Sequence, residues 1–270
     1  MNRSNWFWSS MAIVGLITTI VFVSGFVYAT NQILYPQAQT QQLNQVPEPT
    51  QEPIANHSTS TQIIALGDSL TAGTGDLTGL GYVGHVRQKL EEQSGQPVYI
   101  LNNLAIPGYR TEQVLQELSN QRTRDALAEA ELILLSIGGN DLFLGGMGIF
   151  VEEKPDEFNA AVIVERTPAA LRSVEQILTE IRASNASATI VYVGLYNPYL
   201  PLDTKKTGSL AIQSWNAEVF KIINRFDNVF LVPTYDIFVK EQDRFLAADD
   251  FHPNGDGYER IADRIVQILK

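Results

Sequence analysis

The stretch IIALGDSLTAGTGD, residues 63–76, decides how the chain folds. Its first four residues are apolar, and they run directly into the turn sequence of residues 67–69. A short apolar run that ends in turn residues is typical of a buried strand in a parallel sheet. Gly73 and Gly75 then follow at positions where a helix would be expected. The stretch therefore raises the question of whether Ser69 is an ordinary turn residue, part of a phosphate-binding loop, or a nucleophile.

Three known glycine motifs do not fit this stretch. A dinucleotide-binding fingerprint needs a third glycine or an alanine, and Thr78 stands at that position. A P-loop needs a lysine after its last glycine, and the first lysine of the chain is Lys89. The motif G-x-S-x-G fails because Thr71 replaces its last glycine. What remains is a strand-to-helix turn capped by Asp68 or Ser69, or a nucleophilic serine.

Apolar, β-branched runs recur along the chain and alternate with amphipathic stretches. The runs that we expect to form buried parallel strands are 62–66, 97–102, 131–137, 189–195 and 228–233. The stretches that we expect to form helices are about 82–94, 111–129, 157–184, 208–226 and 255–269. This alternation predicts an α/β fold, a doubly wound three-layer α/β/α sandwich with a five-stranded parallel sheet, formed by residues 61–270 as one domain.

The N-terminal segment has the composition of a membrane-spanning helix. Residues 6–29 carry no charge and are long enough to cross a bilayer core of about 30 Å. Arg3 precedes them and the next basic residue is Arg87, so the N-terminus is expected in the cytoplasm and the rest outside. Cleavage after Ala29 by signal peptidase is the alternative, which would secrete the protein. We favour a transmembrane anchor because the apolar run exceeds the about 7–15 residues of a usual signal peptide.

Composition sets further bounds. Residues 30–60 are rich in Gln, Pro, Thr and Asn, and they are predicted to be a disordered linker. The net charge of −11 among 270 residues argues against a nucleic-acid partner. The chain has no cysteine, which excludes disulfides, thiolate metal sites and a cysteine nucleophile.

A second candidate segment lies near the C-terminus, in the sequence DDFHPNGDGY of residues 249–258. Asp249 and His252 are three residues apart, so a tight turn places their side chains on the same side. The carboxylate can then accept the imidazole Nδ1–H and leave Nε2 free as a base. Pro253 favours an extended backbone at His252. The alternative is a surface histidine beside a helix cap.

Two further residues follow predicted strands. Asn140 comes after the strand 131–137, where its side-chain amide can donate to a developing oxyanion; the alternative is an ordinary turn asparagine. Gly108 lies in the loop after strand 97–102, where its backbone N–H is sterically open, although alone it is only a turn glycine. In parallel sheets ligands bind at the carboxyl ends of the strands, so these loops are expected at one rim.

Together, the sequences GDSL at residues 67–70, Gly108, GND at 139–141, and Asp249 with His252 resemble the SGNH or GDSL family of serine esterases and acylhydrolases. Residues 193–198 resemble its bacterial lipase/acylhydrolase branch. The resemblance implies a flavodoxin-like SGNH-hydrolase domain that needs no metal or organic cofactor. It also implies a catalytic triad and an oxyanion hole. The triad would be Ser69, His252 and Asp249, and the oxyanion hole Ser69, Gly108 and Asn140.

The expected partners are a small-molecule, lipid or glycan ester as substrate and a membrane bound through the N-terminal helix, with no obligate protein partner. Residues 142–151 are expected either to cover an acyl chain or to pack on the core, and residues 196–201 to form an apolar wall. Three alternatives stay open. They are removal of O-acetyl groups from envelope or extracellular polysaccharide, a metal-dependent phosphoesterase that uses Asp68, Asp141, Asp249 and His252, and a non-catalytic surface binding module.

Overall fold

The computed structural model describes residues 15–16, 18–19, 21–25, 60–143, 150–151 and 154–270. It divides into two units, Met1–Asn56 and His57–Lys270, which are treated separately. Most of the predicted transmembrane segment 6–29 and nearly all of the predicted linker 30–60 lie outside the described residues. Residues 15–16, 18–19 and 21–25 are helical, but no helix in the described part of the chain is long and apolar enough to cross a membrane. The anchor and the linker therefore stay predictions.

Five parallel strands form the central sheet of the second unit. Its spatial order is β2-β1-β3-β6-β7. The strands are β1 (Thr61–Gly67), β2 (Val98–Asn103), β3 (Leu132–Ser136), β6 (Thr189–Val193) and β7 (Val229–Val232). Each of the five overlaps a predicted run, so the parallel sheet is confirmed. Taken in chain order, this arrangement is the flavodoxin-like one.

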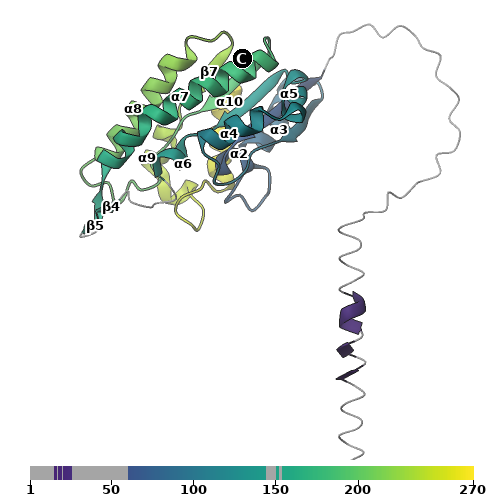
Figure 1. Ribbon diagram of the computed structural model, residues 1–270, viewed down its shortest axis with the longest axis horizontal. Helices are drawn as coiled ribbons and strands as arrows, with labels where there is room; N and C mark the ends of the chain where they lie inside the picture. Colours follow the sequence, from purple (N-terminus) through teal and green to yellow (C-terminus); the bar gives the residue numbers. More distant parts are fainter. Residues whose placement is uncertain (1–14, 17, 20, 26–59, 144–149, 152–153) are drawn as a thin grey trace, which may run out of the picture. The chain divides into compact units, whose positions relative to one another are not determined.

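Helices cover both faces of the sheet (Figure 1). One face packs against α3 (Gly81–Ser94), α9 (Tyr235–Phe245) and α10 (Gly255–Ile268). The other packs against α4 (Thr111–Leu118), α5 (Gln121–Ala128), α7 (Ala160–Ser184) and α8 (Thr207–Ile223). Two short helices, α2 (Ser69–Ala72) and α6 (Gly139–Phe143), follow β1 and β3. The predicted three-layer sandwich is therefore confirmed.

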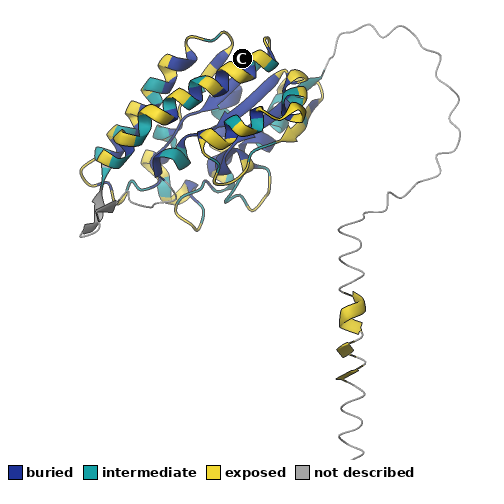
Figure 2. Cartoon of the chain, viewed as in Figure 1, coloured by how far each residue is buried: buried dark blue, intermediate teal, exposed yellow. Residues whose placement is uncertain are grey.

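Strand β1 explains how the two cores form. Ile63 and Ala65 pack with the α3–α10 side, whereas Ile64 and Leu66 pack with the α4–α7 side. All four are at most 1% exposed, because successive side chains of a strand point to opposite faces. Figure 2 shows the result: the inner strands are buried, and the outer surfaces of the helices carry many exposed residues. A continuous apolar run is what a strand buried on both faces requires.

Three elements differ from the sequence prediction. The stretch 111–129 forms two helices rather than one, because the Asn120 side chain accepts the backbone N–H of Arg122 and starts α5. The helix predicted from 157 begins at Ala160, since β5 (Lys154–Phe158) pairs with β4 (Phe150–Val151) just before it. Helix α9 was not predicted at all.

The candidate site lies beside β1, where the connections between strands begin to run in opposite directions across the sheet. Strand β1 stands between β2 and β3, so the chain crosses to opposite sides of β1 after successive strands. Such a switch point leaves a crevice at the carboxyl ends of the strands. The loops after β1 and β3 border it directly, because Gly67 pairs with Ser136 at the ends of these strands.

Candidate active site

The turn after β1 fixes Ser69 at the start of a short helix. Gly67 has a φ of 138°, and a Cβ there would lie 2.0 Å from the carbonyl oxygen of Ser136, so only glycine fits. Asp68 is the N-cap of α2, because its Oδ1 accepts the backbone N–H of Leu70 at 3.1 Å. Gly73 ends the helix with a φ of 83°. The cap residue is therefore Asp68, and Ser69 is the first helical residue.

Behind Ser69, a chain of buried hydroxyl groups ends at the Asp68 carboxylate. The Ser136 hydroxyl donates to Asp68 Oδ1 at 2.7 Å. It also contacts the Thr71 hydroxyl at 2.6 Å, and Thr71 contacts the Tyr82 hydroxyl at 2.5 Å. Burial raises the pKa of Asp68 to about 6, although the Ser136 hydrogen bond opposes this shift. Sequence reasoning missed this network, because Ser136 lies inside an apolar run.

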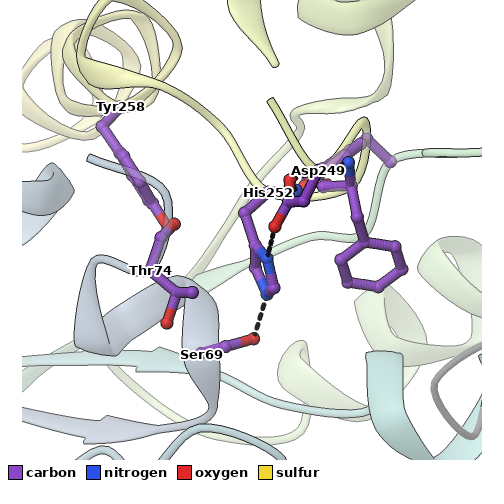
Figure 3. Close-up of polar contacts among 7 residues, drawn as sticks. Ser69, Thr74, Asp249, His252 and Tyr258 are labelled. Atoms are coloured by element: carbon purple, nitrogen blue, oxygen red, sulfur yellow. Dashed lines mark hydrogen bonds and ion pairs between the residues drawn. The ribbon is translucent and has the colours of Figure 1, made fainter. Parts of the chain in front are cut away.

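The side chains of Asp249, His252 and Ser69 form a continuous hydrogen-bonded chain (Figure 3). His252 Nδ1 lies 2.6 Å from Asp249 Oδ2, and His252 Nε2 lies 2.9 Å from Ser69 Oγ. Asp249 Oδ1 also accepts the backbone N–H groups of Phe251 and His252, at 3.0 and 2.9 Å. Ser69 begins α2, and Asp249 and His252 lie in the loop before α10; the spacing of Asp249 and His252 predicted their contact, and the family resemblance implied that Ser69 would join them.

Asp249 is well exposed to solvent, with 46% of its side chain accessible. What burial it has raises its pKa, but the hydrogen bonds from His252 and from the backbone N–H groups lower it more, so the net shift is downward. The carboxylate therefore stays ionised to a more acidic pH than an ordinary aspartate. Its exposure weakens its electrostatic effect on the imidazole, so its hydrogen bonds mainly orient the ring.

Two tyrosine hydroxyls fix the loops around the site: one bonds to the loop that carries His252 and the other to the loop after α2, and sequence reasoning found neither contact. The Tyr196 hydroxyl donates to the carbonyl of Phe251 at 2.5 Å. The Tyr258 hydroxyl of α10 donates to the carbonyl of Thr74 at 2.7 Å, as Figure 3 shows. The helical spacing of Tyr258 indicated a core residue, and it gave no sign of this bond.

A close approach of two loops explains why residue 75, the last glycine of the opening stretch, has no side chain. The φ of Gly75 is 94°, and a Cβ there would lie 2.9 Å from the Cβ of His252 and 2.7 Å from the carbonyl oxygen of Pro253. The loop after α2 therefore approaches the histidine loop so closely that no side chain fits between them.

Asn140 and Gly108 border the same pocket as Ser69. Asn140 is the second residue of α6, and its side-chain Nδ2 donates to the carbonyl of Tyr109 at 2.9 Å. This bond ties the loop after β3 to the loop that carries Gly108. Gly108 has a φ of 86°, and no atom lies within 4 Å of where its Cβ would stand. Ser69, Gly108, Asn140 and His252 all line one open pocket.

Asp141 does not join the other carboxylates. Its Oδ1 accepts the Thr111 hydroxyl at 2.6 Å and its Oδ2 the Thr111 backbone N–H at 3.0 Å, where α4 begins. Burial raises its pKa, against the opposing Thr111 hydrogen bonds. Among the residues that the structure describes, no three His, Asp or Glu side chains are grouped as metal ligands. Asp141 thus orients α4, and the metal-dependent alternative gains no support from its position.

Comparison with known proteins places this geometry in a family. The model of the GDSL-like lipase/acylhydrolase family matches residues 65–260. An uncharacterized protein of Bacillus subtilis, YpmR, is 33% identical over 221 residues, which cover 79% of this chain and 85% of that protein. The spore germination lipase LipC of Bacillus licheniformis is 27% identical over 206 residues, which cover 76% of this chain and 94% of that protein.

Solved structures give the same result. The lipase Lip_vut3 from a goat rumen metagenome superimposes with a TM-score of 0.67 at 25% identity, covering 77% of this chain and 96% of its own. A family 3 carbohydrate esterase of Clostridium thermocellum shares the fold, with a TM-score of 0.56 at 19% identity over 78% of this chain and 97% of its own. Since the family model spans most of the domain, the chain belongs to the GDSL-like lipase/acylhydrolase family and is a carboxylic ester hydrolase.

Proposed function

We propose that this hydrolase cleaves esters through a Ser69–His252–Asp249 triad and a covalent acyl-enzyme intermediate. The observation that carries the proposal is the unbroken hydrogen-bond chain from Asp249 through His252 to Ser69 Oγ. A serine hydroxyl is a weak nucleophile unless a neighbouring base removes its proton. His252 Nε2 is within hydrogen-bonding reach of that proton, and Asp249 holds the ring so that Nδ1 carries the other one.

The first half of the reaction forms the acyl-enzyme. Ser69 Oγ bonds to the carbonyl carbon of the ester while its proton passes to His252 Nε2. The carbonyl oxygen takes up the negative charge of the tetrahedral intermediate. When the carbon–oxygen bond to the alcohol breaks, His252 gives its proton to the departing oxygen. The acyl group remains on Ser69, and the alcohol leaves.

The second half returns the enzyme to its starting state. A water molecule loses a proton to His252 Nε2 and attacks the acyl carbon. Collapse of this intermediate breaks the bond to Ser69 Oγ, which takes back the proton from His252. The products are a carboxylic acid and the free serine.

The oxyanion in both halves is proposed to be bound by the backbone N–H groups of Ser69 and Gly108 and by the Asn140 side chain. Support comes from the shared pocket and from the empty space beside Gly108, which lets an oxygen approach the backbone. The Asn140 Nδ2 group has two hydrogens. One is donated to Tyr109, which fixes the amide, and the second is available for substrate.

The decisive experiment is Ser69→Ala in the full chain, assayed with p-nitrophenyl butyrate and with a fluorophosphonate label. We expect the rate to fall by at least about 10³-fold and labelling to disappear. Ser119→Ala, at the exposed end of α4, is the matched control and should keep both. Wild-type rates in Ser69→Ala would overturn the triad. Labelling that persists in Ser69→Ala and disappears in another serine variant would move the nucleophile elsewhere.

We also propose that the domain works outside the cytoplasm, held by residues 6–29 as a transmembrane anchor. The support is the uncharged composition of this segment and the lack of basic residues between Arg3 and Arg87. Protease added to intact cells should degrade the domain but spare a cytoplasmic marker. Recovery of a shortened chain beginning at Thr30 would show secretion instead, and full protection from protease would overturn an external location.

A further inference from the structure

Two hollows of different chemical character meet at Ser69. Four residues border both of them: Ser69, Asn140, Phe251 and His252. The first hollow is completed mainly by the apolar side chains of Leu70, Phe143, Leu195, Tyr196 and Pro198. The second is completed by Thr74, Pro107, Gly108, Tyr199 and Asp249, and it is the more open of the two. An ester whose carbonyl lies at Ser69 therefore extends into an apolar hollow on one side and a more polar one on the other.

Apart from the residues that the two hollows share, the polar side chains that border the apolar hollow already have partners. The Tyr196 hydroxyl donates to the carbonyl of Phe251. The Asp68 carboxylate accepts from Leu70 and Ser136. A hydroxylated or charged acyl group placed here would lose its hydrogen bonds to water and find none in exchange, which is costly. A hydrocarbon chain loses none, and it gains from leaving water.

Phe143, which borders the apolar hollow, belongs to a packed aromatic cluster. Phe143, the last residue of α6, is 2% exposed. Its ring meets those of Tyr199 and Phe251 nearly edge-on, with centroids 5.7 and 6.4 Å apart. Phe251 in turn lies against the His252 ring at 4.8 Å. Phe143 is thus fixed by its neighbours and cannot swing away freely to admit a longer chain.

Resting on the proposed function, we infer that this enzyme is selective for straight, unsubstituted acyl chains longer than acetyl, that the apolar hollow binds this chain, and that Phe143 limits its length. The alcohol part of the ester then lies in the open hollow beside Gly108 and Thr74. This orientation also suits catalysis, because the alcohol must leave while the acyl group stays on Ser69.

Gly139 offers a way to narrow the same hollow without disturbing the aromatic cluster. It borders the hollow, and a Cβ at this position would lie 3.7 Å from Leu195 Cδ2, an ordinary van der Waals contact. Gly139→Ala therefore adds one methyl group to the wall without a clash. Phe143→Val does the opposite, because it removes part of a side chain that borders the hollow.

The test compares p-nitrophenyl acetate, butyrate, methoxyacetate and octanoate on the full-length protein. Butyrate should exceed acetate by about tenfold in kcat/KM, the value of two buried methylene groups. The kcat/KM for methoxyacetate, in which an ether oxygen replaces a methylene of butyrate, should fall towards the value for acetate. Phe143→Val should raise the octanoate-to-butyrate ratio severalfold, and Gly139→Ala should lower it. The matched control is Leu127→Ala in α5, a fully buried core residue near the other end of the sheet, which should change neither ratio.

The outcomes separate the two proposals. Ester hydrolysis that depends on Ser69 but shows the same chain-length ratio in the wild type, Phe143→Val and Gly139→Ala would overturn the assigned hollow and leave the triad standing. If the wild-type protein hydrolyses only the acetate ester, the assigned hollow is also overturned, and an O-acetyl esterase is favoured. Hydrolysis that persists in Ser69→Ala would instead overturn the proposed function. If Phe143→Val fails to fold, the opposite shift expected of Gly139→Ala still decides.

Discussion

His252 Nε2 lies 2.9 Å from Ser69 Oγ, although 183 positions separate the two residues in the sequence. The contact depends on the loop after α2 and the loop before α10 meeting at one rim of the sheet. Contacts on both sides of the imidazole hold them there. Asp249 orients the ring, and Gly75 lets the first loop approach the histidine backbone. The geometry of the pair is therefore sensitive to small changes in either loop.

Gly75→Ala should lower kcat, because it displaces the histidine loop. The added Cβ would lie 2.9 Å from the Cβ of His252, closer than real contacts allow, so the histidine loop must shift. A shift of about 1 Å at a reacting group can cost about 10² in rate. Gly79→Ala is the matched control, because Gly79 also has a positive φ, of 73°, but no atom lies within 4 Å of its Cβ position. Equal kcat values in the two variants would contradict the close-approach explanation.

Asp249→Asn should lower kcat by about 10²-fold, towards the lower end of the range for general acid–base groups. Nearly half of the Asp249 side chain is exposed, so water screens its charge and orientation of the ring is its main contribution. KM should change little, because the carboxylate does not need to touch substrate. Asp250→Asn is the control, since asparagine tolerates the left-handed backbone found there, with a φ of 53°. A loss equal to that of Ser69→Ala would show a larger role for the carboxylate.

Much of this architecture could be predicted from sequence, because parallel strands buried on both faces leave continuous apolar runs. The first run is an example: residues 63–66 are apolar without interruption, and all of them are buried. The contact of Ser69 with His252 was implied by the resemblance of their two motifs to the GDSL family. Their catalytic roles stay a proposal until Ser69 and His252 are substituted.

The rest depended on contacts that leave no local pattern. Helix α9 has only 11 residues, and Glu241 has non-helical backbone angles within it, so its apolar positions did not form a long regular stripe. The Tyr196 and Tyr258 hydroxyls donate to backbone carbonyls of other segments, and any residue has a carbonyl to offer. The stretch 111–129, predicted as one helix, is interrupted at 119–120, where the side chain of Asn120 caps the second helix, and asparagine is a residue type that favours this position.

Asn140→Ala should lower kcat by about 10²–10³-fold, as the loss of one oxyanion donor commonly does, and leave KM nearly unchanged. The amide also holds the Tyr109 carbonyl, so part of the effect comes from the loop that carries Gly108. Asn140→Asp keeps the shape of the side chain, but a carboxylate cannot donate to the Tyr109 carbonyl, and it brings a negative charge to the place of the oxyanion. It should therefore be at least as inactive as the alanine variant. An active Asn140→Asp would exclude an oxyanion role for this side chain.

Asp68→Asn should stabilise the protein at neutral pH and have much less effect in acid. The Asp68 pKa is raised from 3.8 in the unfolded chain to about 6 in the fold, mainly by burial. Between these values the folded state binds more protons than the unfolded state, so the free energy of unfolding falls as pH rises. At 1.36 kcal/mol for each pKa unit, the carboxylate costs about 3 kcal/mol at pH 7. An asparagine oxygen can still accept from Leu70 and Ser136, so the variant keeps the hydrogen bonds without the charge.

Urea denaturation of both proteins from pH 4 to pH 7 measures this difference. The gain of Asp68→Asn over the wild type should grow by about 2 kcal/mol across the range, because the unfolded carboxyl group is already partly ionised at pH 4. Asp243→Asn, an exposed position on α9, is the control and should follow the wild-type curve more closely. Parallel curves for Asp68→Asn and the wild type would mean that the carboxyl group is not ionised at a cost in the fold. Buried negative charge beside a nucleophile is retained at the expense of stability only where the site depends on it, so kcat should fall in the variant even as the fold becomes more stable.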